Sequence, residues 1–413
     1  MRPLGTAGAL SADRVLWVPY AQRGSIYPVV PLVQELRRRG KEILLLGPDG
    51  LKPLAKTLGV GFQPYASDIS YDWSDRGRSD EHAMGPRALG RAWFRERVRA
   101  EFLEVEGAVS SFDPSVLLAD SFVVGAGMAA EFRNIAWASY VHYLFDEGAE
   151  VDAMYRIWWE GPGPGNEPYL RWWDELRGSV GVGPETRPPR DVPWLRMSPH
   201  LTFLLGHPLL RQGQRELPHY VARTSFPPWD ETGTGVDLGE WPSMAQRRPR
   251  VLVANSSAWQ DDFALVRETL AALADQDVDV VATVAAEHDL DTDVPSNAVM
   301  SGYTSHTSLL PHVDAVVSTA GYGLVSKALW WGRPLVLAPR GRDQHYVADA
   351  VSRAGCGVRI SWPPDPDELR RAVKEAIGSA RTRERARQLS GPIPGHAGPR
   401  RATEMLLDLV RRS

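Results

Sequence analysis

Short runs of apolar residues alternate along this chain with segments in which apolar positions recur every three or four residues. Val15–Pro19 and Glu42–Leu46 are such runs, and residues 26–39 between them have helical spacing. Continuous apolar runs are typical of strands buried on both faces of a parallel sheet. The order strand, loop, helix, strand therefore predicts the opening unit of a parallel α/β sheet.

The same order recurs twice. It returns first over residues 116–140 and again from Arg250 onwards, while residues 208–248 are rich in Pro, Gly and polar side chains and are expected to form a linker. We expect an α/β fold of two Rossmann-like domains facing a cleft, over about 1–227 and 228–395, with 396–413 forming a last helix that packs back towards the first domain. The elements expected in the second half are the strands Arg250–Ala254, Val278–Val284, Ala298–Tyr303, Ala315–Val317 and Pro334–Ala338 and the helices Phe263–Ala274, Pro366–Ile377 and Ala402–Arg411.

Composition excludes several classes of protein. The 413 residues carry a net charge of −4, which argues against a nucleic-acid coat or a protein that binds anionic membranes. No apolar run approaches the roughly 18–20 residues that cross a bilayer. The single cysteine, Cys356, cannot form an internal disulfide, so a cytoplasmic location is expected.

A glycine-containing turn follows the strand predicted at Ala315–Val317. Its sequence is Ala320-Gly321-Tyr322-Gly323, and a helix is predicted directly after it. A strand, a tight turn and a helix aim free backbone N–H groups at an anion. The turn therefore predicts a phosphate site.

The stretch Gly302–Val358 resembles the donor-binding signature of GT-B glycosyltransferases of the family 1 type, which includes the enzymes that decorate antibiotics. The resemblance implies inverting, metal-independent transfer of a sugar from a nucleotide diphosphate sugar, used as a co-substrate, to a natural-product acceptor. It implies no further cofactor.

The resemblance also assigns donor-binding residues. Asp343 and Gln344 match the pair that hydrogen-bonds the hydroxyls of the sugar, a task that suits a carboxylate beside an amide. Ser256 and Ser257 match the turn that donates to the diphosphate. Tyr303 matches the aromatic that stacks on the nucleobase, although an aromatic residue that ends a buried strand can equally belong to the core.

The turn departs from the family pattern at three positions. Thr319 stands where the family has a histidine, Leu324 where it has a hydroxyl, and Lys327 where a glutamate holds the ribose. Thr319 can still donate one hydrogen bond, and Gly321, Tyr322 and Gly323 keep their backbone amides. Lys327 cannot accept from ribose but can pair with an anion, or it can be a surface residue of the helix.

The first domain lacks the family's general base. In the loop after the first strand, Ser25 occupies the place of the histidine that deprotonates the acceptor, while Asp120 matches the carboxylate that supports it. A serine hydroxyl has no useful basicity near neutral pH, so Ser25 is expected to cap the helix at Ile26 or to orient the acceptor. Three explanations stay open: another acid such as Asp120, Asp146 or Asp343 takes the proton, the acceptor is itself acidic, or the protein does not catalyse.

Aromatic residues gather around a Gly/Pro loop in the middle of the first domain. Trp158 and Trp159, followed by Trp172 and Trp173, would line an acceptor pocket together with Asp146, or would pack an extra helical hairpin. No metal site is expected. The alternative function is a catalytically inactive, glycosyltransferase-like auxiliary protein that activates a partner enzyme, and a homodimer is an open expectation.

Overall fold

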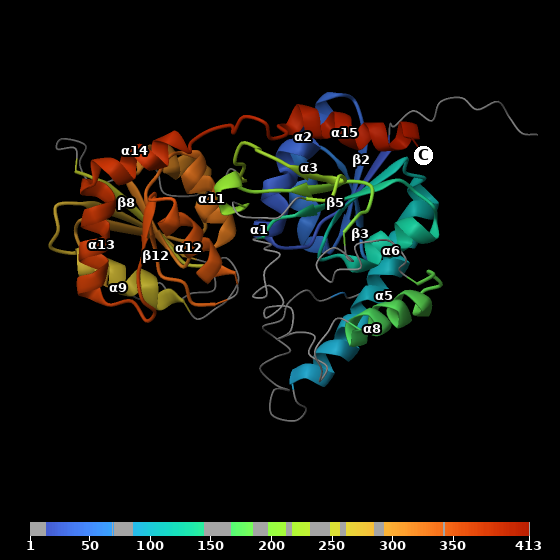
Figure 1. Ribbon diagram of the computed structural model, residues 1–413, viewed down its shortest axis with the longest axis horizontal. Helices are drawn as coiled ribbons and strands as arrows, with labels where there is room; N and C mark the ends of the chain where they lie inside the picture. Colours follow the sequence, from blue (N-terminus) through green and yellow to red (C-terminus); the bar gives the residue numbers. More distant parts are fainter. Residues whose placement is uncertain are drawn as a thin grey trace, which may run out of the picture.

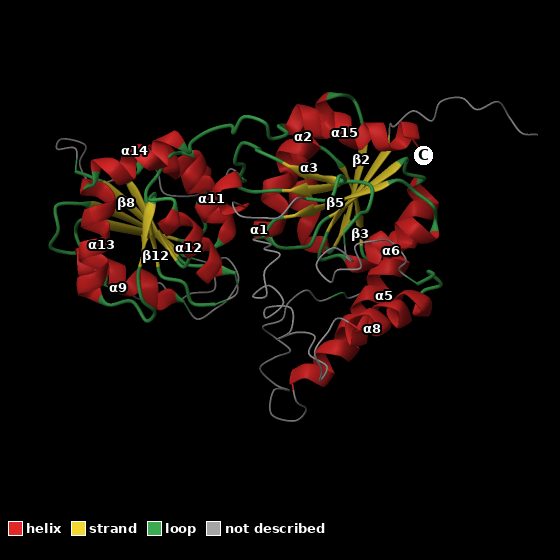
Figure 2. Ribbon diagram, viewed as in Figure 1, coloured by secondary structure: helices red, strands yellow, loops and turns green. Residues whose placement is uncertain are grey.

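The computed structural model describes residues 14–67, 69, 86–143, 167–184, 197–211, 217–231, 248–256, 262–284, 293–341 and 343–412. They form two parallel sheets flanked by helices, so the predicted α/β class and its two-sheet organisation are confirmed (Figure 1, Figure 2). In Figure 1 the first sheet lies on the right and the second on the left.

The first sheet has seven parallel strands in the order β3-β2-β1-β4-β5-β6-β7. Its strands are β1 (Arg14–Val18), β2 (Glu42–Gly47), β3 (Gly61–Pro64), β4 (Val116–Asp120), β5 (Trp137–Val141), β6 (Thr202–Leu204) and β7 (Val221–Arg223). Its helices are α1 (Arg23–Ile26), α2 (Val30–Arg38), α3 (Lys52–Leu58), α5 (Pro86–Phe112), α6 (Val124–Phe132) and α8 (Glu167–Ser179).

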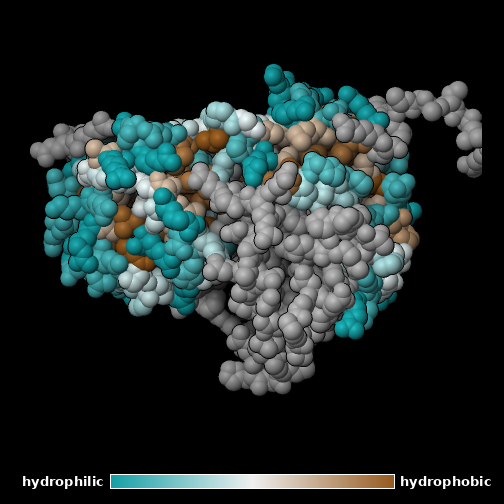
Figure 3. Space-filling model, viewed as in Figure 1, coloured by the Kyte–Doolittle hydropathy of each residue, from teal (hydrophilic) through white to brown (hydrophobic). Residues whose placement is uncertain are grey.

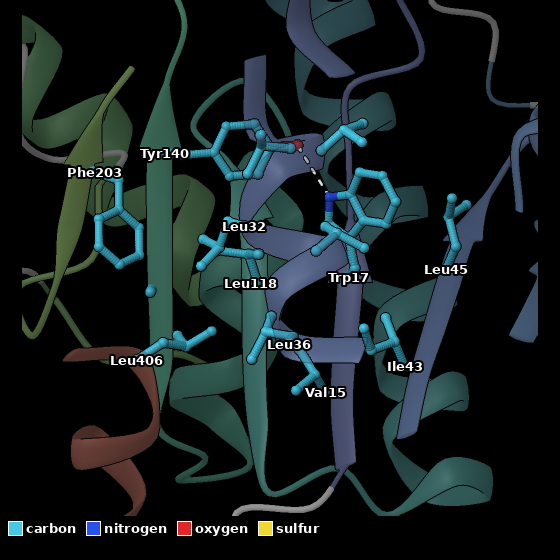
Figure 4. Close-up of a cluster of buried hydrophobic side chains, with 14 of the residues drawn as sticks. Val15, Trp17, Leu32, Leu36, Ile43, Leu45, Leu118, Tyr140, Phe203 and Leu406 are labelled. Atoms are coloured by element: carbon cyan, nitrogen blue, oxygen red, sulfur yellow. Dashed lines mark hydrogen bonds between the residues drawn. The ribbon is translucent and has the colours of Figure 1, made fainter. Parts of the chain in front are cut away.

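Alternate residues of each strand enter different cores on the two faces of this sheet. Leu16 and Val18 pack with α5, α6 and α8, while Val15 and Trp17 pack with α2, α3 and α15 (Pro399–Arg412). This is the two-residue period of a strand buried on both sides. In the second core Trp17 Nε1 donates to the Tyr140 hydroxyl at 3.4 Å (Figure 4). Leu406 from α15 belongs to the same core.

The second sheet has six parallel strands in the order β10-β9-β8-β11-β12-β13. Its strands are β8 (Arg250–Ala254), β9 (Asp279–Thr283), β10 (Ala298–Ser301), β11 (Ala315–Ser318), β12 (Leu335–Leu337) and β13 (Gly357–Arg359). Its helices are α9 (Phe263–Leu273), α10 (His306–Leu309), α11 (Tyr322–Trp330), α12 (Gln344–Arg353), α13 (Pro366–Gly378) and α14 (Ala380–Gln388).

Two predicted elements differ from the structure for reasons that can be stated. The single helix expected over 26–39 is broken into α1, a 3-10 turn at Tyr27–Val29, and α2, because Pro28 and Pro31 lack the N–H that a continuous helix needs. The linker expected over 208–248 contains β7, a strand too short to leave an apolar run. A 3-10 turn, Pro208–Arg211, places Leu209 and Leu210 in the core of the second sheet.

The two sheet units lie side by side in the molecule (Figure 1). Figure 1 places α1 of the first unit and α11 of the second on the sides that face each other. Most of the described atoms visible on the second unit in Figure 3 are hydrophilic. Among the described helices none is long and apolar enough to cross a membrane.

Candidate active site

Three polar side chains of the first unit form a chain of contacts at the carboxyl ends of β1, β4 and β5. Ser25 Oγ lies 2.8 Å from His142 Nε2, and His142 Nδ1 lies 3.1 Å from Asp120 Oδ2. The latter contact is an ion pair only when the ring is protonated, and in the described structure neither of its two atoms makes a hydrogen bond. The Asp120 side chain is fully buried, and the His142 side chain is 10% exposed.

The strand order explains why these residues meet. β4 lies between β1 and β5, and the carboxyl ends of parallel strands share one edge of a sheet. Asp120 is paired with Tyr140 in the β4–β5 register, so His142 follows two residues later on the same edge. Asp120 Oδ1 accepts from the Phe122 backbone N–H at 2.8 Å, which fixes the carboxylate.

The structure corrects the expected role of Ser25 as a helix cap. α1 begins at Arg23 with Gln22 at its N-cap position, so Ser25 lies inside the helical turn. Its hydroxyl bonds to the imidazole of His142, a residue that the sequence reasoning did not single out. The sequence did carry a sign of this role for His142. The residue directly follows the apolar strand β5, and the adjacent strand β4 ends in Asp120.

The glycine turn of the second unit connects β11 to α11 as predicted. Gly321 is the N-cap of α11, and as a glycine it offers no side chain to cap this helix. Ala320, which is fully buried, has a φ of 66°, a left-handed backbone conformation that costs a non-glycine residue of the order of 1 kcal/mol. Strained backbone of this kind clusters at ligand-binding turns.

Thr319 and Ser256 lie together beside this turn. Their hydroxyl oxygens are 3.1 Å apart, and the Ser256 backbone N–H donates to Asp262 Oδ2 at 2.9 Å. They stand at the ends of adjacent strands, β8 and β11. Two hydroxyls next to the start of α11 can both donate to an oxyanion.

Tyr322 does not face the same way as the rest of the turn. Its hydroxyl donates to the Leu205 carbonyl at 2.8 Å, and its ring covers Gly206, where an added Cβ would lie 2.3 Å from a ring carbon. The Tyr322 side chain therefore attaches the segment after β6 to the second unit. Donor binding by Tyr322 stays a prediction that concerns its backbone amide. A Cβ at Gly321 or Gly323 would meet nothing within 4 Å, so neither glycine is required by close packing of its neighbours.

Lys327 is already paired with a protein carboxylate. Its Nζ forms an ion pair with Asp230, whose other oxygen accepts from Thr307 N and Oγ1 at 2.8 and 2.7 Å. Burial acts to raise the pKa of Asp230, but the charge and hydrogen bond of Lys327, together with His306 and the hydrogen bond from Thr307, lower that pKa overall. Lys327 is therefore neither a free surface residue nor available to a phosphate while this pair is closed.

Tyr303 lies past the end of β10 and contacts the first unit. The Arg23 guanidinium lies over its ring, 4.1 Å from the centroid, and its hydroxyl donates to the Tyr27 hydroxyl at 3.2 Å. Tyr27 in turn donates to Glu231 Oε2 at 2.8 Å. Desolvation and these hydrogen bonds raise the pKa of Tyr27. One face of Tyr303 is therefore covered by a cation in this structure.

Asp343 and Gln344 stand at the start of α12 as predicted. Asp343 is the N-cap residue without a side-chain capping bond to α12, and Gln344 is buried. Gln344 Oε1 accepts from the backbone N–H groups of Arg340 and Gly341 at 2.9 and 3.0 Å. The carbonyl oxygen of Gln344 is thus used to shape the loop, and contact with a sugar would involve its amide nitrogen.

The remaining predicted residues divide into two groups. Ser257, Asp146, Trp158 and Trp159 lie outside the described residues. Of the second tryptophan pair, Trp173 is fully buried in the core with α5 and α6, which favours the packing interpretation over a pocket for that residue.

Two further observations concern metal binding and the position of a cavity. Within the described residues no group of three or more His, Cys, Asp or Glu side chains is placed to hold a metal ion. A shallow cavity of about 520 Å³ opens at the ends of β12 and β13, lined by residues that include Arg340, Arg359 and Trp362. It lies apart from the Ser25–His142–Asp120 contacts.

Comparisons with known proteins agree with this geometry. Residues 267–409 match the model of the family described as "Erythromycin biosynthesis protein CIII-like, C-terminal domain". The chain is 27% identical over 411 residues to 4'-demethylrebeccamycin synthase of Lentzea aerocolonigenes, covering 91% of this chain and 94% of that protein. Over 41% of this chain and 40% of the relative it is 30% identical to a PGL/p-HBAD biosynthesis glycosyltransferase of Mycobacterium tuberculosis.

Solved structures show the same fold. The calicheamicin glycosyltransferase CalG4 superposes with a TM-score of 0.74 at 21% identity, covering 97% of this chain and 98% of that chain. The glycosyltransferase VinC in complex with dTDP superposes with a TM-score of 0.72 at 20% identity, covering 97% and 100%. The GT-B arrangement expected from the resemblance is therefore confirmed.

Proposed function

We propose that this chain, which is homologous to glycosyltransferases of antibiotic biosynthesis and has their GT-B fold, transfers a sugar from a nucleotide diphosphate sugar to a natural-product acceptor. The transfer inverts the anomeric carbon by direct displacement and uses no metal. Positioning of the two substrates and stabilisation of the departing diphosphate supply most of the rate.

One observation carries the proposal: the turn after β11 leads into α11 through an N-cap glycine, which has no side chain, beside the hydroxyls of Ser256 and Thr319. Helix amides with the positive end of the helix dipole behind them attract an oxyanion. The diphosphate of the donor binds there, with Ser256 and Thr319 donating to it. The strained Ala320 holds the turn open, since its conformation sets the direction of the amides that follow.

The donor sugar lies towards α12 in this proposal. Asp343 accepts hydrogen bonds from the sugar hydroxyls, and the amide nitrogen of Gln344 donates to one. Tyr303 stacks on the nucleobase once Arg23 leaves its ring. Lys327 stays with Asp230, so the ribose hydroxyls have no carboxylate at that position and the donor nucleotide is expected to be selected by other contacts.

The test is direct. We expect titration calorimetry to show that UDP or TDP binds at millimolar concentration or below. We also expect mass spectrometry to show sugar transfer when the protein is incubated with a panel of nucleotide sugars and natural-product acceptors. Failure of UDP, TDP and GDP alike to bind would remove the proposal.

Asp343→Ala is expected to abolish turnover while nucleotide affinity stays within about threefold, because the lost carboxylate holds the sugar and not the diphosphate. Asp349→Ala is the matched control. It removes an acid from the same helix that pairs with Arg359 at the surface, and it should leave turnover unchanged. Equal loss in both variants would show that the effect comes from disturbing α12.

The alternative of an inactive auxiliary protein was based on the missing histidine of the loop after β1. Because another histidine, His142, lies beside Asp120, that argument is weaker. A homodimer, an auxiliary partner and a cytoplasmic location stay expectations. Size-exclusion chromatography of the purified chain tests the first.

A further inference from the structure

The loop after β1 supplies no base, since Ser25 stands where the resemblance expects a histidine. A different histidine reaches this place from a different strand. His142 directly follows β5, and its Nε2 lies 2.8 Å from Ser25 Oγ while its Nδ1 lies 3.1 Å from Asp120 Oδ2. The imidazole thus spans the distance between the carboxylate and the serine.

We propose that His142 is the general base of the transfer, contributed by the end of β5 in place of the loop after β1. This inference rests on the proposed function, because it needs an acceptor hydroxyl to deprotonate. Asp120 keeps the supporting role that the resemblance assigns to it. Ser25 becomes a positioning residue whose hydroxyl occupies the acceptor's place on the imidazole.

The neighbours of the two ring nitrogens determine where the proton lies. A carboxylate only accepts, so Nδ1, which faces Asp120, carries the proton. Nε2 then has a free lone pair, and the Ser25 hydroxyl donates to it. A neutral imidazole with its lone pair turned towards the loop after β1 is the form in which histidine acts as a base.

Burial separates the roles of His142 and Ser25. The His142 side chain keeps 10% of its surface accessible, while Ser25 is only 1% exposed. Part of the imidazole is therefore accessible, while Ser25 covers Nε2. A rotation of Ser25 about χ1 would free Nε2, and the acceptor hydroxyl would replace one hydrogen bond with an equivalent one.

The step balances without any further reactant. The acceptor oxygen forms a bond to the anomeric carbon as the bond from that carbon to the diphosphate oxygen breaks. The acceptor proton moves to His142 Nε2, and the diphosphate leaves with the bonding electron pair. The resulting imidazolium lies beside the Asp120 carboxylate, which stabilises its charge.

Several aromatic and charged groups surround the imidazole. The rings of Phe122 and Tyr143 pack against it in edge-on contacts, with centroids 5.4 and 5.5 Å away. Behind Asp120, Arg97 of α5 pairs with the buried Glu101, and Tyr140 also senses the charge of Asp120. Burial raises the pKa of Glu101, with Arg97 only partly offsetting it. These groups hold the ring in one orientation and leave Nε2 as the nitrogen that faces away from Asp120.

The first measurement needs no substrate. Long-range proton–nitrogen NMR of the full chain labelled with ¹⁵N-histidine, assigned by comparison with His142→Asn, reports which ring nitrogen carries the proton. We expect the proton on Nδ1 and a hydrogen bond accepted by Nε2. A proton found on Nε2 of the neutral ring would overturn the proposal.

The second measurement uses phenols of graded acidity as acceptors with UDP-glucose and TDP-glucose. In His142→Asn the amide N–H still reaches towards Asp120, but no base is present. We expect kcat for phenol and para-methoxyphenol to fall on the order of 10²–10⁴-fold, and the acid limb of the pH–rate profile to vanish. With para-nitrophenol at alkaline pH, where the acceptor is already ionised, we expect a loss below about tenfold.

Two controls separate base catalysis from structural damage. His312→Gln replaces an exposed histidine outside the site and should change neither kcat nor the pH profile. Ser25→Ala should keep more than about a tenth of the wild-type kcat, because it removes only the hydroxyl that the acceptor replaces. If His142→Asn folds poorly, added imidazole should restore turnover in His142→Ala.

The outcomes distinguish the two proposals. If the wild-type chain binds no nucleotide and transfers no sugar, the proposed function itself is contradicted. Transfer that survives in His142→Asn with its acid limb intact, or a loss that is the same for all three phenols, contradicts the role of His142 alone. A Ser25→Ala loss as large as that of His142→Asn contradicts the positioning role of Ser25.

Discussion

A single imidazole joins the segment after β6 to the end of α14. His207 Nδ1 accepts from the Leu209 backbone N–H at 3.2 Å, so the proton lies on Nε2, which donates to the Leu389 carbonyl at 2.7 Å. Both nitrogens are satisfied only in the neutral ring. Burial therefore lowers the pKa of His207 to about 4, although the bond to Leu389 acts in the opposite direction.

This shift predicts a loss of stability in acid. The unfolded chain binds a proton to this histidine near pH 6.5, whereas the folded chain does so only near pH 4, so stability falls as pH drops through that window. By pH 5 the contribution amounts to about 2 kcal/mol relative to pH 7. His306, whose pKa desolvation also lowers to about 4, adds a similar amount.

Denaturant unfolding at pH 7 and pH 5 measures this fall in the free energy of unfolding. His207→Asn should be less stable than wild type at pH 7 but should lose only about half as much stability on acidification, because His306 still contributes. An unchanged pH dependence in the variant would contradict the lowered pKa of His207.

The sequence predicted the positions of some individual site residues and missed others. Asp120, Thr319 and Asp343 stand at strand or helix ends because local apolar runs locate those ends. His142 was not singled out, since its meaning depends on β4 and β5 being neighbours. Asp230 was missed for a stronger reason: no local pattern says that a linker carboxylate will neutralise Lys327, which follows it by nearly a hundred residues.

Among the elements, the contact between α5 and α6 is unusually close. A Cβ added at Gly125 of α6 would lie 2.4 Å from the Val98 carbonyl oxygen and 2.5 Å from the Phe102 nitrogen, both of the α5 backbone. Main-chain atoms cannot rotate away as a side chain can. The glycine at position 125 is therefore required by the approach of α5.

Gly125→Ala is expected to destabilise the protein by about 2–3 kcal/mol, since the methyl group would force the two helices apart. Gly107→Ala in α5 is the matched control, because a Cβ there meets nothing within 4 Å. Replacing a helical glycine by alanine at an open position should stabilise by about 0.5–1 kcal/mol. Thermal melts of the two variants should therefore shift in opposite directions.

The predicted elements were those with strong periodicity. Buried parallel strands such as β1, β4, β8 and β11 leave continuous apolar runs, so their places were predicted to within a residue or two. The strands β6 and β7 were not predicted: β7 is a half-exposed three-residue strand that leaves no apolar run, and β6 lies in a short apolar stretch with no predicted helix beside it. The long helix α5 was not predicted, because charged and apolar residues are mixed around its circumference.

Across the whole molecule, the ion pair of Lys327 with Asp230 is a contact between α11 and the segment that follows β7. The Asp230 side chain is 3% exposed and that of Lys327 is 16% exposed. Removing one partner of a buried pair leaves the other charge uncompensated, at a cost of about 3–5 kcal/mol.

Lys327→Met is therefore expected to destabilise the chain by about 3 kcal/mol. Adding Asp230→Asn should recover at least half of that loss, since the amide oxygen still accepts from Thr307 and carries no charge. Denaturant unfolding of the single and double variants measures both effects. A double variant no more stable than Lys327→Met would mean that the charge of Asp230 is not what makes the single change costly.

The helix α15 covers α2 on the first sheet unit and contributes Ala402, Leu406, Leu407 and Val410 to its core. During synthesis the ribosome makes residues 399–412 only after the entire second unit has been translated. Until then the apolar face of α2 that includes Leu32 and Leu36 remains exposed to water. The earliest-made half of this protein thus reaches its final packing last, and the period before α15 emerges is when its nascent chain is most exposed to aggregation.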